Sequence, residues 1–208
     1  MALDTFTALK ASIADYLVDD NLTAVIPDFI TLCETRFHRD LRIREMEKQS
    51  TLTLTGGTAT VAIPADFLEA RAMLLNSSTP RILTVKTPVQ FFTDHASQTS
   101  GTPESYAIIG DNFHFGPTPS SGLTATLTYY AKVTALSSST ASNDILAAAP
   151  DLYLYGSLLE AAPYLGEDER INVWVQLYDR SVAELKAVAD RASWSSGPLV
   201  QRVEVYGP

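Results

Sequence analysis

The sequence predicts an α+β fold, in which helices from both ends of the chain form a bundle and a β-rich segment is inserted between them. Apolar residues recur at helical spacing in residues 4–41 and again in residues 143–192. Between these stretches, residues 44–143 contain short β-prone runs separated by clusters of Gly, Pro, Ser and Asn. Strands grouped between helices favour an α+β arrangement over an alternating parallel sheet.

Composition limits the class of protein further. The chain has 208 residues, of which 46% are hydrophobic and 19% charged, so we expect a sizeable packed core. No apolar run is long enough to span a membrane, and the first residues do not follow the pattern of a signal peptide. The single cysteine, Cys33, excludes an internal disulfide. We therefore expect synthesis in a reducing cytoplasm.

The charge balance argues against a protein that grips nucleic acid. The net charge is −9, and residues 144–208 contribute most of it, with ten acidic and five basic side chains. A surface that binds DNA by neutralising phosphates should be basic. An acidic chain can still lie near DNA if its task is to avoid sticking to it.

The N-terminal part of the bundle is predicted to begin with a helix over residues 4–18, which Asp4 or Thr5 would cap. A second helix opens at Pro27, since proline suits the first helical position. The apolar residues expected to be buried are Phe6, Leu9, Ile13 and Leu17 in the first helix, and Phe29 or Ile30, Cys33, Phe37 and Leu41 in the second.

A basic cluster closes the second helix. It contains Arg36, Arg39 and Arg42, together with His38 and Arg44. One interpretation is a patch that binds phosphate or a partner protein. The other is that the cations favour a helix C-terminus and pair with nearby acids, and charge patterning favours this second interpretation. The acids concerned are Glu34, Asp40, Glu45 and Glu47.

The inserted segment is predicted to contain two hairpins. Residues 50–55 and 58–63 flank Gly56-Gly57, a pattern typical of a β-hairpin. Residues 106–109 and 113–115 flank a second turn at 110–112. The other expected elements are a turn over 64–67, strands over 69–75, 81–86 and 123–133, and a short helix from its cap Thr87 to about His95.

Residues 143–192 are interpreted as the two helices around which the fold is organised. Pro150 opens the shorter helix, Pro163 ends or kinks it, and Gly156 indicates a point of close backbone approach. The expected apolar faces are Leu152, Tyr155, Leu159 and Ala162, widened by Leu154 and Leu158, in the shorter helix, and Ile171, Trp174, Tyr178, Val182, Leu185 and Val188 in the longer one.

The last residues differ from the helix before them. Trp194 and Gly197-Pro198 interrupt the helical pattern, and the apolar residues Leu199, Val203 and Val205 then stand among polar ones. This strand-like segment either pairs with the β-rich part or adds to another subunit. A disordered tail is the alternative.

Residues that would carry catalysis are not grouped in the sequence. It contains no glycine-rich phosphate loop, no metal-binding spacing of Cys and His, and no Gly-x-Ser-x-Gly. The three histidines lie in different expected elements, and Cys33 on an apolar helix face is expected to be inert. Asp66 and Glu69 could form a carboxylate pair, but a turn aspartate and a surface glutamate are the favoured interpretation. We expect no enzymatic activity, no cofactor and no metal.

Four structural motifs follow one another along the chain: IPDFITLCETRFHRDLRIREME, the Gly-Gly pair followed by IPADFLEA, TPESYAIIGDNFHFGPTP, and APDLYLYGSLLEAAPYLGEDERINVW. In this order they resemble the head-to-tail adaptor proteins of short-tailed bacteriophages, also called connector, tail tubular protein A-like or gatekeeper-ring proteins. Each motif is structural, and their order over residues 5–190 carries the resemblance. It implies a helical bundle with a β-rich insertion, here residues 1–43 with 144–192 and residues 44–143, followed by an extended tail over 193–208.

The resemblance also implies a function. Such proteins form a ring, usually of twelve copies, which joins the portal protein to the tail nozzle protein and prolongs the DNA channel without binding DNA specifically. The expected location is the neck of the virion. The tail would reach the portal, so the implied portal contacts are Trp194, Leu199, Val203, Val205 and Tyr206, while Arg36, Arg39 and Arg42 would meet an acidic partner.

A ring needs two different patches on each subunit, and the helices of 150–165 and 167–192 are expected to supply them. Two other functions stay open at this stage. One is a binding module, with the β-rich part recognising a tail or cell-surface partner. The other is a virion hydrolase built on Asp66 and Glu69.

Overall fold

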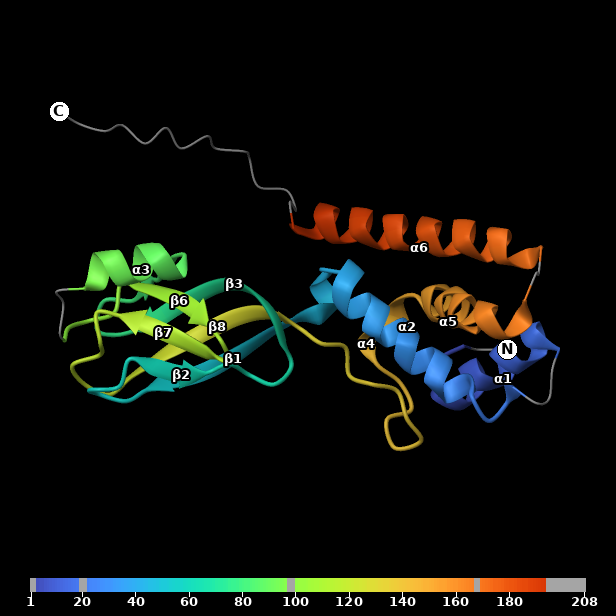
Figure 1. Ribbon diagram of the computed structural model, residues 1–208, viewed down its shortest axis with the longest axis horizontal. Coiled ribbons are helices and arrows are strands. Elements are labelled where there is room, and N and C mark those ends of the chain that lie inside the picture. Colours follow the sequence, from blue (N-terminus) through green and yellow to red (C-terminus); the bar gives the residue numbers. More distant parts are fainter. Residues whose placement is uncertain (1–2, 19–21, 97–99, 167–168, 194–208) are drawn as a thin grey trace, which may run out of the picture. The chain divides into compact units, whose positions relative to one another are not determined.

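The computed structural model describes residues 3–18, 22–96, 100–166 and 169–193, and it confirms the α+β prediction (Figure 1). The chain forms two compact units, one made of residues 1–33 and 137–208 and the other of residues 34–136. The first unit is helical, and the second contains the strands. The division falls inside helix α2 (Ile26–Asp40).

The helical unit contains α1 (Phe6–Leu17), the start of α2, α4 (Asp144–Ala148), α5 (Pro150–Leu165) and α6 (Arg170–Ser193). Thr5 caps α1, because its hydroxyl accepts a hydrogen bond from the Ala8 N–H at 3.2 Å. The predicted faces of the first two helices are confirmed, and both Phe29 and Ile30 are buried. Their fully or nearly fully buried residues are Phe6, Leu9, Ile13, Leu17, Phe29, Ile30, Cys33, Phe37 and Leu41.

Helix α5 lies at the centre of the helical unit, and its predicted apolar face is confirmed only for Leu152, Leu154 and Leu158. It packs against α1, α4 and α6, so it is buried on several sides rather than along one stripe. Tyr155, Leu159 and Ala162 are only half-buried. The buried residues are Leu152, Tyr153, Leu154, Gly156, Ser157, Leu158 and Ala161. Because its apolar sides are used within the unit, α5 does not offer the wide docking stripe that we expected of residues 150–165.

The ends of α5 also differ from the prediction. A separate short helix, α4, precedes it, capped by the Asn143 side chain, which accepts a hydrogen bond from the Leu146 N–H at 2.9 Å. Pro163 lies inside α5 and does not end it. The helix continues for only two residues beyond this proline, so the missing N–H affects its last turn alone. Gly166 then turns the chain, with φ of 67°.

The prediction of close packing at Gly156 is confirmed. A methyl group at this position would collide with the Cys33 sulfur and would lie 3.1 Å from the Tyr178 ring. Glycine therefore lets α5 approach α2 and α6 closely. Along α6, which runs beside α5 in Figure 1, Trp174 and Tyr178 are buried as expected. Val188 was expected on the same face, but it is 57% exposed.

The second unit is a β-sandwich of two four-stranded sheets. One sheet has the order β1-β8-β3-β4 and the other β2-β7-β6-β5. Both contribute to one core, which includes Leu54, Met73, Phe113, Phe115 and Leu127. The strands are β1 (Glu47–Leu54), β2 (Thr60–Ala62), β3 (Phe67–Asn76), β4 (Arg81–Ile82), β5 (Thr84–Val85), β6 (Ser105–Ile109), β7 (Asn112–Gly116) and β8 (Leu123–Ala131).

The hairpin predicted at Gly56-Gly57 is wrong, although a turn is present there. The Thr58 N–H donates to the Thr55 carbonyl at 3.1 Å, and Gly57 has φ of 81°. However, β1 pairs along its whole length with β8, and β2 pairs with β7. The turn therefore carries the chain from one sheet to the other. Leu52 and Leu54 need to face the core between the sheets, and this requirement determines the pairing of β1.

Other local predictions in this unit are confirmed. The β6–β7 hairpin turns at Gly110 and Asp111, and helix α3 (Pro88–His95) has Thr87 as its cap. The Phe67 N–H donates to the Pro64 carbonyl at 3.0 Å in the predicted turn. The strand expected over 81–86 is divided, because the chain passes from one sheet to the other at the buried Leu83.

Two side chains of α2 bind the segment that follows β8. The carboxyl group of Glu34, which is 3% exposed, accepts a hydrogen bond from the Leu136 N–H at 2.8 Å. One turn further along α2, the Nε2 atom of His38 accepts a hydrogen bond from the Val133 N–H at 3.1 Å. These bonds explain why the second half of α2 belongs to the β-sandwich unit.

Candidate interaction surfaces

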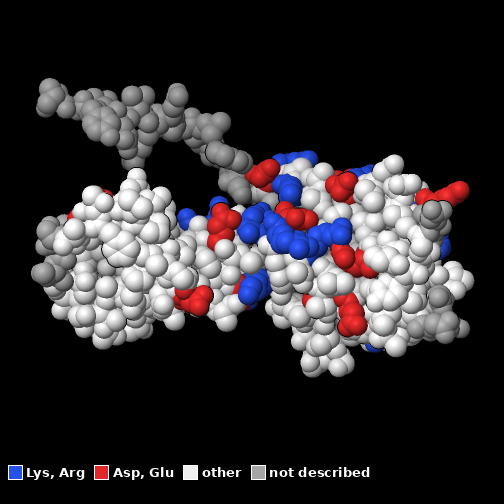
Figure 2. All heavy atoms as spheres, in the orientation of Figure 1, with Lys and Arg blue, Asp and Glu red and all other residues white. Residues whose placement is uncertain are grey.

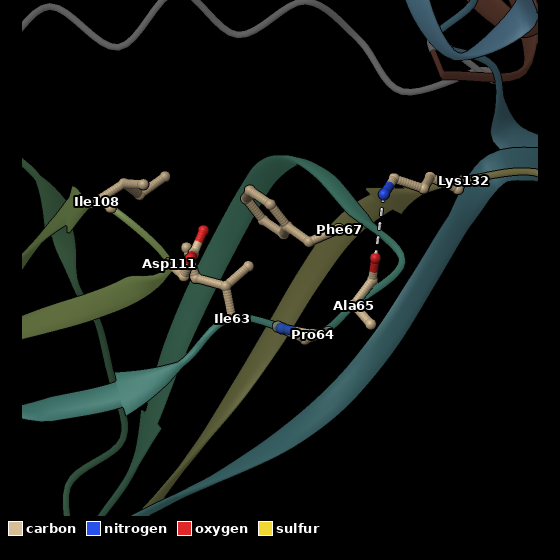
Figure 3. A pocket seen from close by; sticks show the side chains of 8 residues that line it. Ile63, Pro64, Ala65, Phe67, Ile108, Asp111 and Lys132 are labelled. Atoms are coloured by element: carbon tan, nitrogen blue, oxygen red, sulfur yellow. Dashed lines mark hydrogen bonds between the residues drawn. The ribbon is translucent and has the colours of Figure 1, made fainter. Parts of the chain in front are cut away.

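A pocket of about 400 Å³ lies at one end of the β-sandwich (Figure 3). The connection between β2 and β3 and the first residue of β3 supply Ile63, Pro64, Ala65 and Phe67. The β6–β7 hairpin supplies Ile108, Gly110 and Asp111, and the residue after β8 supplies Lys132. In the view of Figure 3, Asp111 and Lys132 lie on opposite sides, with the ring of Phe67 between them. The pocket is therefore apolar in its middle and oppositely charged at its two sides.

Hydrogen bonds hold the walls of this pocket in place. The Ile63 N–H donates to the Asp111 carbonyl at 3.0 Å, and the Lys132 N–H donates to the Asp66 carbonyl at 2.6 Å. The ammonium group of Lys132 also reaches the Ala65 carbonyl at 3.2 Å. The Phe67 ring packs on those of Phe113 and Tyr129. A pocket whose walls are already fixed loses little conformational entropy when it is filled.

Asp66 also holds the connection between β2 and β3 in place. Its carboxylate accepts hydrogen bonds from Lys48 Nζ at 3.0 Å and from the Tyr129 hydroxyl at 2.9 Å. Partial burial alone would raise the pKa of Asp66, but these two hydrogen bonds outweigh it, so the pKa lies below its ordinary value. Burial, together with the bond to Asp66, raises the pKa of Tyr129 to about 12.

We expect the Tyr129 hydroxyl to make stability depend on pH in the alkaline range. Its pKa of about 12 in the folded protein exceeds the ordinary value of 10.0, so its contribution to stability is complete below pH 10.0 and is lost as pH rises from there to about 12. Tyr129→Phe should remove that dependence and cost about 1 kcal/mol at neutral pH through the lost hydrogen bond. Urea denaturation across the alkaline range, with tyrosinate absorbance, measures both effects. An unchanged alkaline slope in the variant would contradict the assignment.

The basic cluster at the end of α2 is partly neutralised. Arg42 forms an ion pair with Glu69 at 3.0 Å and donates to the carbonyl groups of His38 and Leu41. Glu47, expected to pair within the cluster, instead binds Arg71 of β3. Arg39 is exposed and Arg36 is half-buried. The cluster therefore combines a paired arginine with an exposed one that is accessible to a partner.

The two carboxylates considered for hydrolysis bind different cations. Asp66 is held by Lys48, whereas Glu69 pairs with Arg42. Each carboxylate therefore already neutralises a neighbouring cation, as the favoured interpretation of a turn aspartate and a surface glutamate expects.

Two of the three histidines contact the same phenylalanine. Phe91 of α3 packs against His95 and His114, with ring centroids 5.0 and 6.4 Å away, and His95 Nε2 lies 2.7 Å from the Ser105 hydroxyl. His38 binds the Val133 N–H instead. Sequence reasoning missed this arrangement, because it joins α3 to the outer face of β6 and β7. Among the described residues, no group of His, Cys, Asp and Glu is placed to hold a metal ion.

Exposed apolar side chains occur on both units. On the β-sandwich unit they include Ile82, Val85, Val89 and Phe92, which are between 57% and 77% exposed. The face of this unit seen in Figure 2 is largely uncharged. On α6, Val173 and Val188 are exposed. Within the described ranges, no helix is long and apolar enough to cross a membrane. These side chains are available for contacts with other proteins.

The candidate portal contacts lie outside the described residues. These are Trp194, Leu199, Val203, Val205 and Tyr206. Helix α6 is described as far as Ser193, immediately before them.

Comparison with protein families identifies the chain. A family model described as SU10 adaptor protein matches residues 4–202, nearly the whole chain. The protein therefore belongs to this family of bacteriophage adaptor proteins, and the resemblance found in the sequence is confirmed. A search of curated proteins found no significant match.

Proposed function

We propose that this protein forms a ring of twelve copies that joins the portal to the tail nozzle in the virion neck and prolongs the DNA channel. Its membership of a bacteriophage adaptor family over residues 4–202 is the observation that carries the proposal. The net charge of −9 supports it, because an acidic lumen would repel DNA phosphates and let the genome slide.

The surfaces described above support a role in assembly. Exposed apolar residues on both units and a preformed pocket give each copy several different patches, which a closed ring of identical subunits requires. We assign Arg36, Arg39 and Arg42 to contacts with an acidic neighbouring protein, since an arginine fork binds carboxylates well. The residues after α6 are assigned to the portal.

Electron microscopy of this protein mixed with the portal protein of the same virus tests the proposal. We expect rings of this protein stacked on the portal ring. The isolated subunit is expected to be monomeric, with the ring forming only on the portal. Portal particles that carry no added ring at saturating protein would overturn the proposal.

The C-terminal residues are expected to supply much of the affinity for the portal. Replacing Leu199, Val203 and Val205 together by serine should weaken portal binding by about a hundredfold, since each buried apolar side chain contributes roughly 1.5–3 kcal/mol and part of this is offset by ordering the segment. Binding is measured by surface plasmon resonance on immobilised portal.

A matched control comes from the interleaved positions. Arg202 and Glu204 replaced together by serine should leave portal affinity within a few fold of the original, because in an extended segment their side chains would lie on the face opposite to Leu199, Val203 and Val205. Equal losses from the triple variant and the double control would show that the alternation has no role in portal binding.

A further inference from the structure

The pocket at the end of the β-sandwich has a charge pattern that selects its occupant. Its middle is apolar, with Ile63 and Phe67, while Lys132 lies on one side and Asp111 on the other (Figure 3). Both charged residues are exposed, and neither forms an ion pair with another described residue. A complementary surface would present an acid, an apolar side chain and a base in that order, from the Lys132 side to the Asp111 side.

Helix α6 presents this order on one of its faces. Glu184, Val188 and Arg191 follow each other at spacings of four and three residues, which places them in a row along a helix. Val188 is 57% exposed, and the side chain of Glu184 is 63% exposed. The row spans about 10 Å at 1.5 Å per residue, a length suited to a pocket lined by side chains from three connections.

Glu184 is available for a new partner. It now pairs with Arg180 at 2.7 Å, but both side chains are more than 60% exposed. An exposed pair of this kind contributes little to stability, so exchanging the Arg180 partner for another cation has little cost. Arg191 is exposed, close to the end of α6.

We propose that the pocket of one copy receives the Val188 face of α6 from a second copy. Val188 fills the apolar middle, Glu184 meets Lys132, and Arg191 meets Asp111. This inference rests on the proposed ring and deepens it, because it assigns the contact between neighbouring subunits. The two patches differ, so the contact is heterologous and can continue around a closed ring. Docking in the opposite direction would place like charges together, which is strongly unfavourable.

The other exposed apolar face of the β-sandwich unit fits the pocket less well. Val89 and Phe92 of α3 are exposed, but the nearby Lys86 and Asp94 pair with each other at 2.7 Å. That face therefore offers no unpaired charges to Lys132 and Asp111. The charge pattern of α6 makes a second copy's α6 the favoured occupant.

Reciprocal charge reversal tests the contact in the full chain assembled on portal. Lys132→Glu and Glu184→Lys should each reduce ring formation by about tenfold or more, and the double variant should restore it. Arg81→Glu and Asp179→Lys make the same charge changes at exposed positions of the same two units, and both should assemble normally. Thermal unfolding confirms that all variants are folded.

A cross-linking experiment identifies which copies are in contact. Ala65→Cys places a thiol in the pocket lining, and Val188→Cys places one at the middle residue of the row formed by Glu184, Val188 and Arg191. The native Cys33 is buried. A disulfide should form between the two single variants when they are mixed on portal. A disulfide that forms only within a chain carrying both cysteines would overturn the contact between copies.

The outcomes separate this inference from the proposed function. If rings form and both single charge reversals assemble as well as the original protein, the α6 contact is wrong and the ring stands. If the original protein forms no ring on the portal, the proposed function fails and the contact fails with it. Reduced ring formation in both single variants, with recovery in the double variant, supports the α6 contact and the proposed function.

Discussion

Replacing Gly156 with leucine is expected to destabilise the helical unit more than any other single change considered for this protein. Even a methyl group at this position would collide with the Cys33 sulfur and lie 3.1 Å from the Tyr178 ring. A leucine would force α5 away from α2 and α6, at a cost of about 3 kcal/mol or more. This is a large fraction of the roughly 5–15 kcal/mol by which a typical domain is stable. Chemical denaturation followed by circular dichroism measures the loss.

A smaller substitution and a second-site change test the cause. Gly156→Ala gains about 1 kcal/mol of helix propensity but still meets Cys33. Adding Cys33→Ala removes the sulfur, so the double variant should be more stable than the two single losses predict. Gly122→Leu is the matched control, because nothing lies within 4 Å of a Cβ atom added there. If Gly156→Leu were as harmless as Gly122→Leu, the close packing of α5 would be wrong.

The elements predicted well from the sequence are those that local signals determine. Thr87 caps α3 because its hydroxyl accepts from the Gln90 N–H, and both residues lie within one helical turn. The β6–β7 hairpin depends on Gly110, whose φ of 58° suits a tight turn. In α1, a single apolar face matches a single packing surface, so the spacing of Leu9, Ile13 and Leu17 was sufficient.

The failed predictions concern elements whose neighbours are distant in the sequence. Gly56-Gly57 gave a sound turn prediction, but the partner of β1 is β8, in which Leu52 pairs with Ala125 and Leu54 with Leu123. Likewise, α5 is covered by helices from both ends of the chain. A one-sided stripe cannot be read from a helix whose apolar residues face several partners. Tertiary packing, not propensity, decided both cases.

The candidate surfaces were predictable only in part. The sequence placed Arg42 in the basic cluster, but it did not indicate the partner of Arg42, which is Glu69, 27 residues away on β3. The pocket was not predicted, because Ile63, Asp111 and Lys132 come from three separate connections. The turn around Pro64 was the one signal at hand, since it showed where the chain reverses direction at the end of the sandwich. The order of the strands in the two sheets decides which charged residues lie beside the pocket.

Glu34→Ala is expected to release the segment that follows β8 and to cost about 2–3 kcal/mol. The Leu136 N–H donates to this carboxyl group at 2.8 Å, and both residues are buried, at 3% and 7% exposed. The substitution leaves that N–H without an acceptor in a place that water does not reach, which carries the full desolvation cost. The loss is measured by chemical denaturation, and hydrogen exchange at the Leu136 amide should accelerate in parallel.

Two further variants show whether the hydrogen bond is the cause. Glu34→Gln keeps an oxygen at the same place, so it should retain most of the protection of the Leu136 amide. His38→Ala removes the neighbouring acceptor and should expose mainly the Val133 amide, at a smaller cost of about 1 kcal/mol, because this bond is only partly buried. If Glu34→Ala and Glu34→Gln were equally unstable, the contribution of Glu34 would come from its other contacts and not from its bond to Leu136. Selective recovery by Gln would instead show that two acceptors one turn apart on α2 hold the end of β8 in the sandwich unit.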